Sequence, residues 1–192
     1  MNSRQRVEAV LNHQLPDRVP IDFGSTRTTG ITTIAYNQLV RKLGLNEPLP
    51  RMYDVVQQLC YPQQPVKDFF KVDAIDAGQA FYSDSNYWKP FILHDGSQCL
   101  VPSWLDLVQD QQGTKVFDQQ QTLLGIMPPQ SYYIDQTYWV YGQMDKFPEH
   151  IEASHLARDL WAYTTPPPGN MDLGESSQAQ KFRQGIKEMY EQ

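Results

Sequence analysis

The stretch Ser3–Gly24, SRQRVEAVLNHQLPDRVPIDFG, is the part of the chain that most directly indicates a fold. Its first half predicts a short amphipathic helix, because its valines and leucine recur at helical spacing. Pro16 then ends the helix, since proline disfavours helical geometry in the residue before it. The apolar run 19–23 follows as a strand that carries Asp22 near its carboxyl end. A helix, a turn and such a strand are typical of the start of a (β/α) barrel.

A second strand of the same kind is predicted at 72–78, VDAIDAG, an apolar run with Asp73 and Asp76 toward its end. Helical patterns lie between the two strands, as in parallel strands that helices connect. An eight-stranded barrel usually needs about 250 residues, whereas this chain has 192. The predicted fold class is therefore α/β: the N-terminal part of a (β/α)8 TIM barrel, incomplete, with an antiparallel β-hairpin insertion.

The rest of the chain has a different pattern, which divides the single partial domain expected over 1–192 into three parts. Residues 1–80 are expected to hold the helix and the first two barrel strands. Residues 86–147 are predicted to be the antiparallel insertion, because Asp95-Gly96 between apolar runs is a tight-turn signal and a second hairpin follows it. Residues 148–192 are predicted to be mainly helical.

The composition limits the class of protein. The net charge is −6 and the basic residues are scattered, so nucleic acid is not an expected partner. No apolar run is long enough to cross a membrane, and the N-terminus lacks the pattern of a signal peptide. Cys60 and Cys99 are therefore predicted to be free thiols, and the expected location is the cytoplasm.

Five segments with a characteristic order and spacing cover much of the chain. They are SRQRVEAVLNH at 3–13, PDRVP at 16–20, YDVVQQL at 53–59, FKVDAID at 70–76 and HDGSQCLVP at 94–102. In this order they resemble the N-terminal half of proteins of the uroporphyrinogen decarboxylase-like superfamily, especially the branch related to corrinoid-dependent methyltransferases. The resemblance takes in most of this chain.

The resemblance implies either decarboxylation of a tetrapyrrole or methyl transfer that involves a corrinoid. Zinc and a corrinoid are cofactors that it implies for the full-length family, with zinc ligands in the half that this chain does not match. The chain is thus expected to be a truncated member that is inactive alone and holds no cofactor itself. The expected partners are a small-molecule substrate or a corrinoid protein, and a complementary C-terminal half or a second copy of the chain.

Four residues are candidates for the site. Asp76 and Asp22 are the catalytic candidates, because a carboxylate at the end of a barrel strand can stabilise positive charge that develops on a substrate. Arg27 is a candidate for binding a substrate carboxylate, and Asp73 competes with Asp76 for contact with the substrate. Each has a plainer alternative: a backbone cap for Asp22, an ordinary loop arginine for Arg27 and a surface carboxylate for Asp73.

Other residues allow weaker interpretations. A turn could bring His94 and Cys99 together, but two ligands do not make a zinc site. His150 and His155 are predicted to lie on different faces of one helix. The aromatic residues near the end of the insertion form either a packing layer or the wall of a ligand site: Tyr132, Tyr133, Tyr138, Trp139 and Tyr141. The alternative functions are accordingly a half-barrel subunit that needs a partner chain and a small-ligand binding module.

Overall fold

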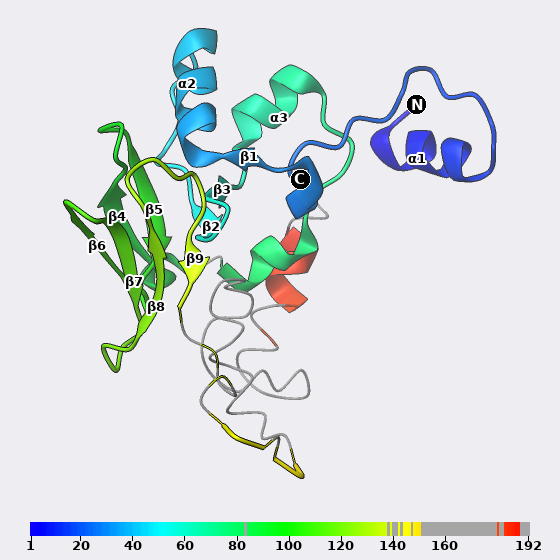
Figure 1. Ribbon diagram of the computed structural model, residues 1–192. Coiled ribbons are helices and arrows are strands. Elements are labelled where there is room, and N and C mark those ends of the chain that lie inside the picture. Colours follow the sequence, from blue (N-terminus) through cyan, green and yellow to red (C-terminus); the bar gives the residue numbers. More distant parts are fainter. Residues whose placement is uncertain are drawn as a thin grey trace.

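The computed structural model describes residues 1–82 and 84–137, together with positions 139, 142, 144–146, 148–150, 180 and 183–188. In this part of the chain the strands form three antiparallel sheets and the helices are short. Figure 1 shows the two larger hairpin structures together on one side of the molecule and the N-terminal helix apart from them on an extended arm.

The first sheet is small, and two of its three strands are buried. Its order is β1–β3–β2, with β1 at Ile31–Thr32, β3 at Leu59–Cys60 and β2 at Met52–Asp54. The strands β2 and β3 are buried along their whole length, so the acidic residue at the end of β2 is buried with its apolar neighbours. A buried carboxylate needs charged or hydrogen-bonding partners, and this one is central to the site described below.

One helix follows β1 and a second follows β3, and their ends match the sequence signals for helix termini. The helix α2 spans Thr33–Leu43 and ends at Gly44, whose φ of 66° is the left-handed cap that glycine favours. The helix α3 spans Gln64–Phe70 and has a proline in its first turn. Both helices lie between the two predicted strands, where the sequence indicates helical patterns. A small core joins them to the first sheet through Tyr36, Cys60 and Val66.

The second sheet is the hairpin of β4 (Trp88–Ile92) and β5 (Gln98–Pro102). Its turn contains Gly96, with a φ of 80°, so the predicted Asp-Gly turn is confirmed. A single parallel bridge between Arg51 and Leu100 brings β5 beside the first sheet. The hairpin is therefore attached to the N-terminal part of the chain through backbone pairing.

The third sheet is a meander of four strands in sequence order. It consists of β6 (Asp106–Asp110), β7 (Gly113–Phe117), β8 (Leu123–Met127) and β9 (Asp135–Gln136). The pair β7–β8 is the second predicted hairpin and is confirmed. The strand β6 was not predicted, because three of its five residues are exposed and its sequence has a weak apolar pattern.

The main core lies where the first sheet meets the two hairpin sheets. Alternate residues of β7 are buried, as expected of a sheet with one covered face. The two tryptophans of the core, Trp88 at the start of β4 and Trp104 after β5, are both less than a tenth exposed. The members of this core with the least exposure are Met52, Val55, Cys99, Val101, Leu105, Val116 and Leu124.

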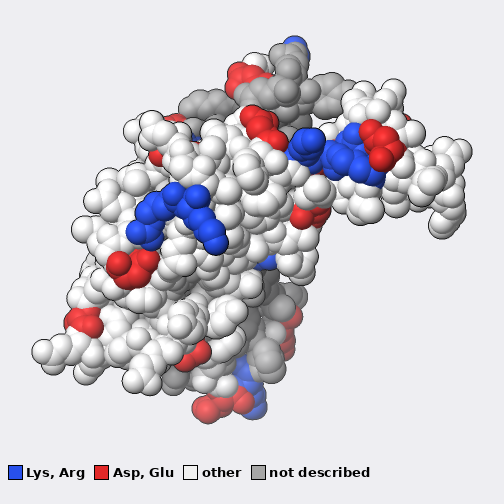
Figure 2. Space-filling model, turned by 90° about the horizontal axis from the view of Figure 1, so that it is seen from above, with Lys and Arg blue, Asp and Glu red and all other residues white. Residues whose placement is uncertain are grey.

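The N-terminal arm, which we define as residues 1–24, has a different character. Its helix α1 spans Ser3–Leu11 and is capped by the Asn2 side chain. The buried residues of α1 are Arg6 and Ala9, so the predicted apolar stripe does not form the buried face. Figure 2 shows the arm from above, with its basic side chains lying against acidic ones.

The predicted TIM-barrel architecture is wrong. The three sheets are antiparallel, and the two predicted barrel strands meet at one parallel bridge, Asp22 with Ala74, which is isolated from every sheet. Parallel barrel strands are buried on both faces, whereas Val19 is 78% exposed. Pro20 interrupts the first segment and cannot donate a ladder hydrogen bond. The second segment continues into the 3₁₀ helix η2 (Ala77–Tyr82) rather than into a barrel helix.

The remaining predictions concern the C-terminal part of the chain. A short helical stretch at 183–188 is described, and most of the helix predicted from Pro148 lies outside the described residues. Within the described part, no helix combines the length and the apolar character needed to cross a membrane.

Candidate functional site

A compact loop at 24–30 positions Arg27. The loop contains the 3₁₀ turn η1 (Arg27–Thr29), and the Gly24 N–H donates to the Thr29 carbonyl at 3.0 Å. Gly24 has a φ of 89°, and a Cβ at this position would lie 2.6 Å from Cδ of Pro62. Only glycine therefore allows the loop to approach the segment after β3 so closely.

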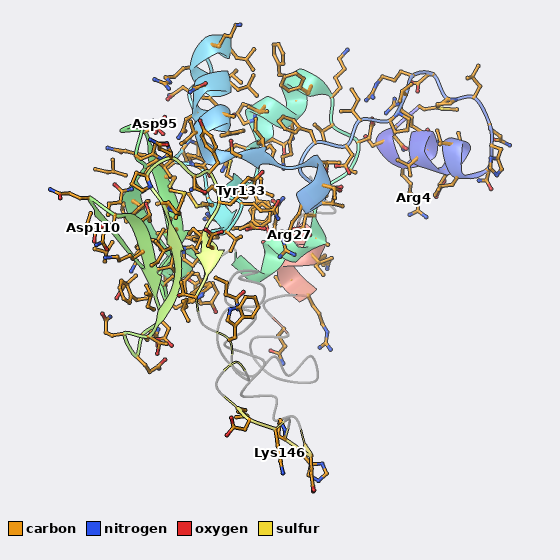
Figure 3. All side chains as sticks on the ribbon, in the orientation of Figure 1. Arg4, Arg27, Asp95, Asp110, Tyr133 and Lys146 are labelled. Atoms are coloured by element: carbon orange, nitrogen blue, oxygen red, sulfur yellow. The ribbon has the colours of Figure 1, made fainter. Side chains whose placement is uncertain are left out.

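Arg27 lies against a carboxylate that the sequence analysis did not identify. Its Nε is 3.1 Å from Oδ2 of Asp54, a side chain with no exposed surface, while Arg27 itself is 37% exposed. The Gln57 backbone N–H and side-chain amide donate to Asp54 at 2.9 and 3.2 Å. A buried, well-bonded carboxylate thus fixes an arginine that reaches the surface. Figure 3 labels Arg27 near the centre of the molecule, far from Arg4 on the arm.

Burial also changes the acidity of Asp54. Desolvation raises the pKa of Asp54, while the hydrogen bonds from Gln57 and the charge of Arg27 act in the opposite direction. The carboxylate therefore depends on these partners to remain ionised.

Two stacked tyrosines connect this ion pair to Asp76. The rings of Tyr53 and Tyr61 are 4.0 Å apart and nearly parallel. The Tyr61 hydroxyl donates to Oδ2 of Asp76 at 3.2 Å, and the Gly78 N–H donates to Oδ1 at 2.7 Å. Burial is the largest cause that raises the pKa of Tyr53, and the charges of Asp54, Arg27 and Asp76 all act on it as well.

These charges are therefore grouped around one tyrosine. We call the group of Arg27, Asp54, Tyr53, Tyr61 and Asp76 the Arg27–Asp76 site. Both tyrosines are about 95% buried, so they support the site from inside, whereas Arg27 and Asp76 are partly exposed and can meet a ligand. The site places a cation and a hydrogen-bond acceptor at the surface, with a rigid aromatic backing.

Asp22 lies at the entrance of the arginine loop. It is exposed, and its Oδ1 accepts a hydrogen bond from the Ser25 N–H at 3.0 Å. Its parallel bridge with Ala74 places it beside the segment that leads to Asp76. This contact matches the alternative role given for Asp22 above, in which its carboxylate caps backbone N–H groups.

Asp73 belongs to a separate network of ion pairs, at the point where the arm joins the rest of the chain. Its side chain is 1% exposed and lies 2.5 Å from Nη1 of Arg6 and 2.6 Å from Nη1 of Arg18. The Ile21 N–H also donates to it, at 2.9 Å. Burial by itself would raise the pKa of Asp73, but these hydrogen bonds outweigh it and lower the pKa to about 2. With two arginines and a backbone N–H on a buried carboxylate, Asp73 connects the arm to the rest of the chain.

The described residues do not fit a zinc ion. They contain no group of three His, Cys, Asp or Glu side chains that could hold a metal. Cys60 and Cys99 are fully buried, and burial raises the pKa of the Cys99 thiol to about 12. A neutral thiol is a poor metal ligand. Cys99 pairs across its hairpin with Phe91, not with His94.

Among the described residues, the aromatic side chains near the end of the meander do not enclose a ligand site. Tyr132, Tyr133 and Trp139 are each more than half exposed, while Tyr138 and Tyr141 lie outside the described residues. Of the two histidines expected on different faces of one helix, His150 is exposed and His155 lies outside the described residues.

One internal cavity lies between the sheets, next to Gln58, His94 and Met127. Its volume is about 10 Å³, which is room for about one water molecule and not for an organic ligand.

Comparison with known proteins gives no relative for this chain. No protein-family model matches it, and neither a curated protein nor a solved structure matches it. Function must therefore be inferred from the site and from the resemblance in the sequence.

Sequence reasoning identified Arg27 and Asp76 but missed Asp54 and the two tyrosines. Their segment, 45–61, fits a helix about as well as a strand, so no burial pattern could be assigned to it. One signal was present. An acidic residue inside the apolar run Met52–Val56 must be paired if that run is buried.

Proposed function

We propose that the Arg27–Asp76 site binds a carboxylated tetrapyrrole, as part of the decarboxylation chemistry that the resemblance to uroporphyrinogen decarboxylase-like proteins implies. One observation carries the proposal. A partly exposed arginine is held by the buried Asp54 carboxylate, and its charge acts on the same tyrosine as that of Asp76.

Each residue of the site has a distinct role in this proposal. Arg27 binds a substrate carboxylate, for which the planar guanidinium provides paired donors. Asp76 accepts hydrogen bonds from pyrrole N–H groups and stabilises positive charge that develops on the macrocycle. Asp54, Tyr53 and Tyr61 do not touch the ligand. They position the two residues that do.

The character of the site favours a carboxylated ring over a corrinoid. The side chains of a corrinoid are mostly amides, which bind an arginine less strongly than carboxylates do.

The direct test is a binding titration with uroporphyrin, the air-stable oxidised form of the proposed substrate, followed by quenching of tryptophan fluorescence. We expect Arg27→Gln to raise the Kd about tenfold or more, because a charge-assisted hydrogen bond is lost. Asp76→Asn should weaken binding less. Arg41→Gln is the matched control, since Arg41 is an exposed arginine on α2 outside the site.

A second titration with cobalamin separates the two branches of the family chemistry. Weaker binding of cobalamin than of uroporphyrin supports the proposal, and the reverse order contradicts it. Equal Kd values for the wild type, Arg27→Gln and Arg41→Gln would also contradict it. Release of carbon dioxide from uroporphyrinogen, lost in Asp76→Asn, would extend the proposal from binding to catalysis.

A further inference from the structure

The end of the N-terminal arm pairs with the segment that leads to Asp76. The Asp73 N–H donates to the Ile21 carbonyl at 2.7 Å, and the Ile21 N–H donates to the Asp73 carboxylate at 2.9 Å. One residue further along both segments, Asp22 and Ala74 form the parallel bridge. The arm is therefore bound to this segment through its backbone as well as through ion pairs.

This pairing is important because residues 72–76 form no regular structure of their own. They lie between the end of α3 and the start of η2, and Ala74 is the one residue among them that takes part in a β-bridge. Segments without a helix or a sheet to hold them are among the first parts of a protein to open locally. The position of Asp76 therefore depends on the groups that hold this segment.

Two arginines of the arm fix the pairing. Arg18 binds both carboxylate oxygens of Asp73, at 2.6 and 3.0 Å, and donates to the Lys71 carbonyl at 2.9 Å. Arg6 binds the same carboxylate at 2.5 Å and is itself 6% exposed. Paired, charge-assisted hydrogen bonds are both strong and directional, so they set the position of the segment as well as its attachment.

The same part of the arm continues directly into the arginine loop. The ring of Phe23 packs edge-on against that of Phe70 at the end of α3, with the ring centroids 5.6 Å apart. Gly24, the last residue of the arm, begins the loop that positions Arg27. The arm thus borders both ligand-binding residues, because it leads into the loop of Arg27 and pairs with the segment of Asp76.

We propose that Arg6 and Arg18 are positioning residues for the Arg27–Asp76 site: the docked arm holds Asp76 in place relative to Arg27, and release of the arm releases Asp76. The partner of Arg27 itself, Asp54, lies on β2 and is held by that sheet. Release of the arm therefore separates the two halves of the site without unfolding the sheets. Because such coupling is reciprocal, a ligand that touches both halves strengthens the docking of the arm.

The first test is hydrogen exchange of the protein without ligand. Arg18→Gln should speed exchange of the Gly78 N–H, which donates to Asp76, by about tenfold or more, because charge-assisted hydrogen bonds that hold the segment are lost. The slowest amides of α1 should quicken by a similar factor. The Gln57 N–H, which donates to Asp54, should keep its wild-type rate.

Two further variants serve as controls, and circular dichroism shows that each variant is folded. Arg4→Gln is the matched control on the arm, since the Arg4 ion pair is with Glu8 of the same helix, and it should leave the Gly78 rate unchanged. Arg18→Lys keeps the charge but not the paired donors, so its rate should fall between those of the wild type and Arg18→Gln.

Two results would overturn the proposal. In the first, Arg18→Gln quickens exchange in α1 but not at Gly78, which would mean that the arm is released while the site stays assembled. In the second, the Val116 amide on β7 quickens as much as Gly78 does, which would mean that the arm opens only when the whole chain opens.

The second test uses the wild-type chain alone and rests on the proposed function. With uroporphyrin at one hundred times its Kd, exchange of the slowest amides of α1 should fall about hundredfold, because the ligand binds only when the arm is docked. Figure 3 shows Arg4, on α1, far from Arg27, so direct contact with the ligand does not account for such an effect. Bound uroporphyrin without this effect would overturn the role of the arm and leave the proposed function standing. Absence of uroporphyrin binding would overturn the proposed function, and exchange at Gly78 would still decide the role of the arm.

Discussion

The N-terminal part of the chain, 1–82, and the hairpin part, 86–137, are stabilised by different interactions. The hairpin part pairs its strands locally and buries alternate apolar residues such as Val116 and Leu124. The N-terminal part has very short strands, and two buried carboxylates, Asp54 and Asp73, organise it through arginines. Apolar burial provides stability with little dependence on partners, whereas each buried charge depends on specific side chains.

The same difference distinguishes the part of the chain that forms the apolar core from the part that holds the candidate site. The apolar contacts of the hairpin part form its core, and its ion pairs, such as Lys89 with Asp106, lie at the surface. The buried carboxylates of the N-terminal part hold two partly exposed arginines, Arg27 through Asp54 and Arg18 through Asp73. Buried ionic groups are costly to desolvate, so they are more informative about function than the apolar core is.

The largest expected effect comes from removing apolar volume in the hairpin part. Leu124 is 1% exposed, so Leu124→Ala leaves a cavity between the sheets and should lower the free energy of unfolding by about 4 kcal/mol. Urea unfolding measures this loss. Val108→Ala, at an exposed position on β6, is the control and should change the free energy by less than about 0.5 kcal/mol. Similar losses in both variants would show that the hairpin part has no tightly packed core.

A smaller and more local effect is expected in the arm. Asp73→Asn removes the shared partner of Arg6 and Arg18, and should destabilise the docking of the arm by about 3 kcal/mol, because the buried guanidinium of Arg6 loses one of its two carboxylate partners and Arg18 loses its carboxylate. Hydrogen exchange should quicken in residues 1–24 and stay slow around Val116. Asp135→Asn, an exposed aspartate on β9, is the control. Uniform acceleration along the chain would show that the arm and the hairpins unfold as one unit.

The same difference explains which parts of the fold could be predicted. The hairpin at Asp95-Gly96 and the glycine cap at Gly44 depend on a few neighbouring residues, and the sequence shows them directly. The barrel prediction depended on two apolar runs, 19–23 and 72–78, forming buried parallel strands. They meet at one bridge only, because nothing covers Val19 and because Asp73 is occupied by the arginines of the arm.

The candidate site could be predicted only in part for a related reason. Arg27 and Asp76 follow apolar segments, so their positions suggested a role. Asp54 could not be assigned, because it lies in a segment of ambiguous pattern and its partner Arg27 is distant in sequence. Asp73 was expected to meet a substrate, yet the residues that surround it, Arg6 and Arg18, come from the opening segment. Long-range charge pairs leave no periodic signal in a single sequence.

The smallest of the three effects is an acid dependence confined to the arm. The pKa of Asp73 is lowered from 3.8 to about 2 in the folded protein, so its ionised form favours the docked arm by about 2 kcal/mol at neutral pH. This contribution is complete above about pH 4 and is lost as the pH falls through about 2. The difference in arm stability between wild type and Asp73→Asn, from hydrogen exchange at a series of pH values, should therefore shrink below pH 4. A difference that stays constant down to pH 2 would mean that the charge of Asp73 is not what binds the arm, and the contrast between a charge-organised region and an apolar one would then be lost.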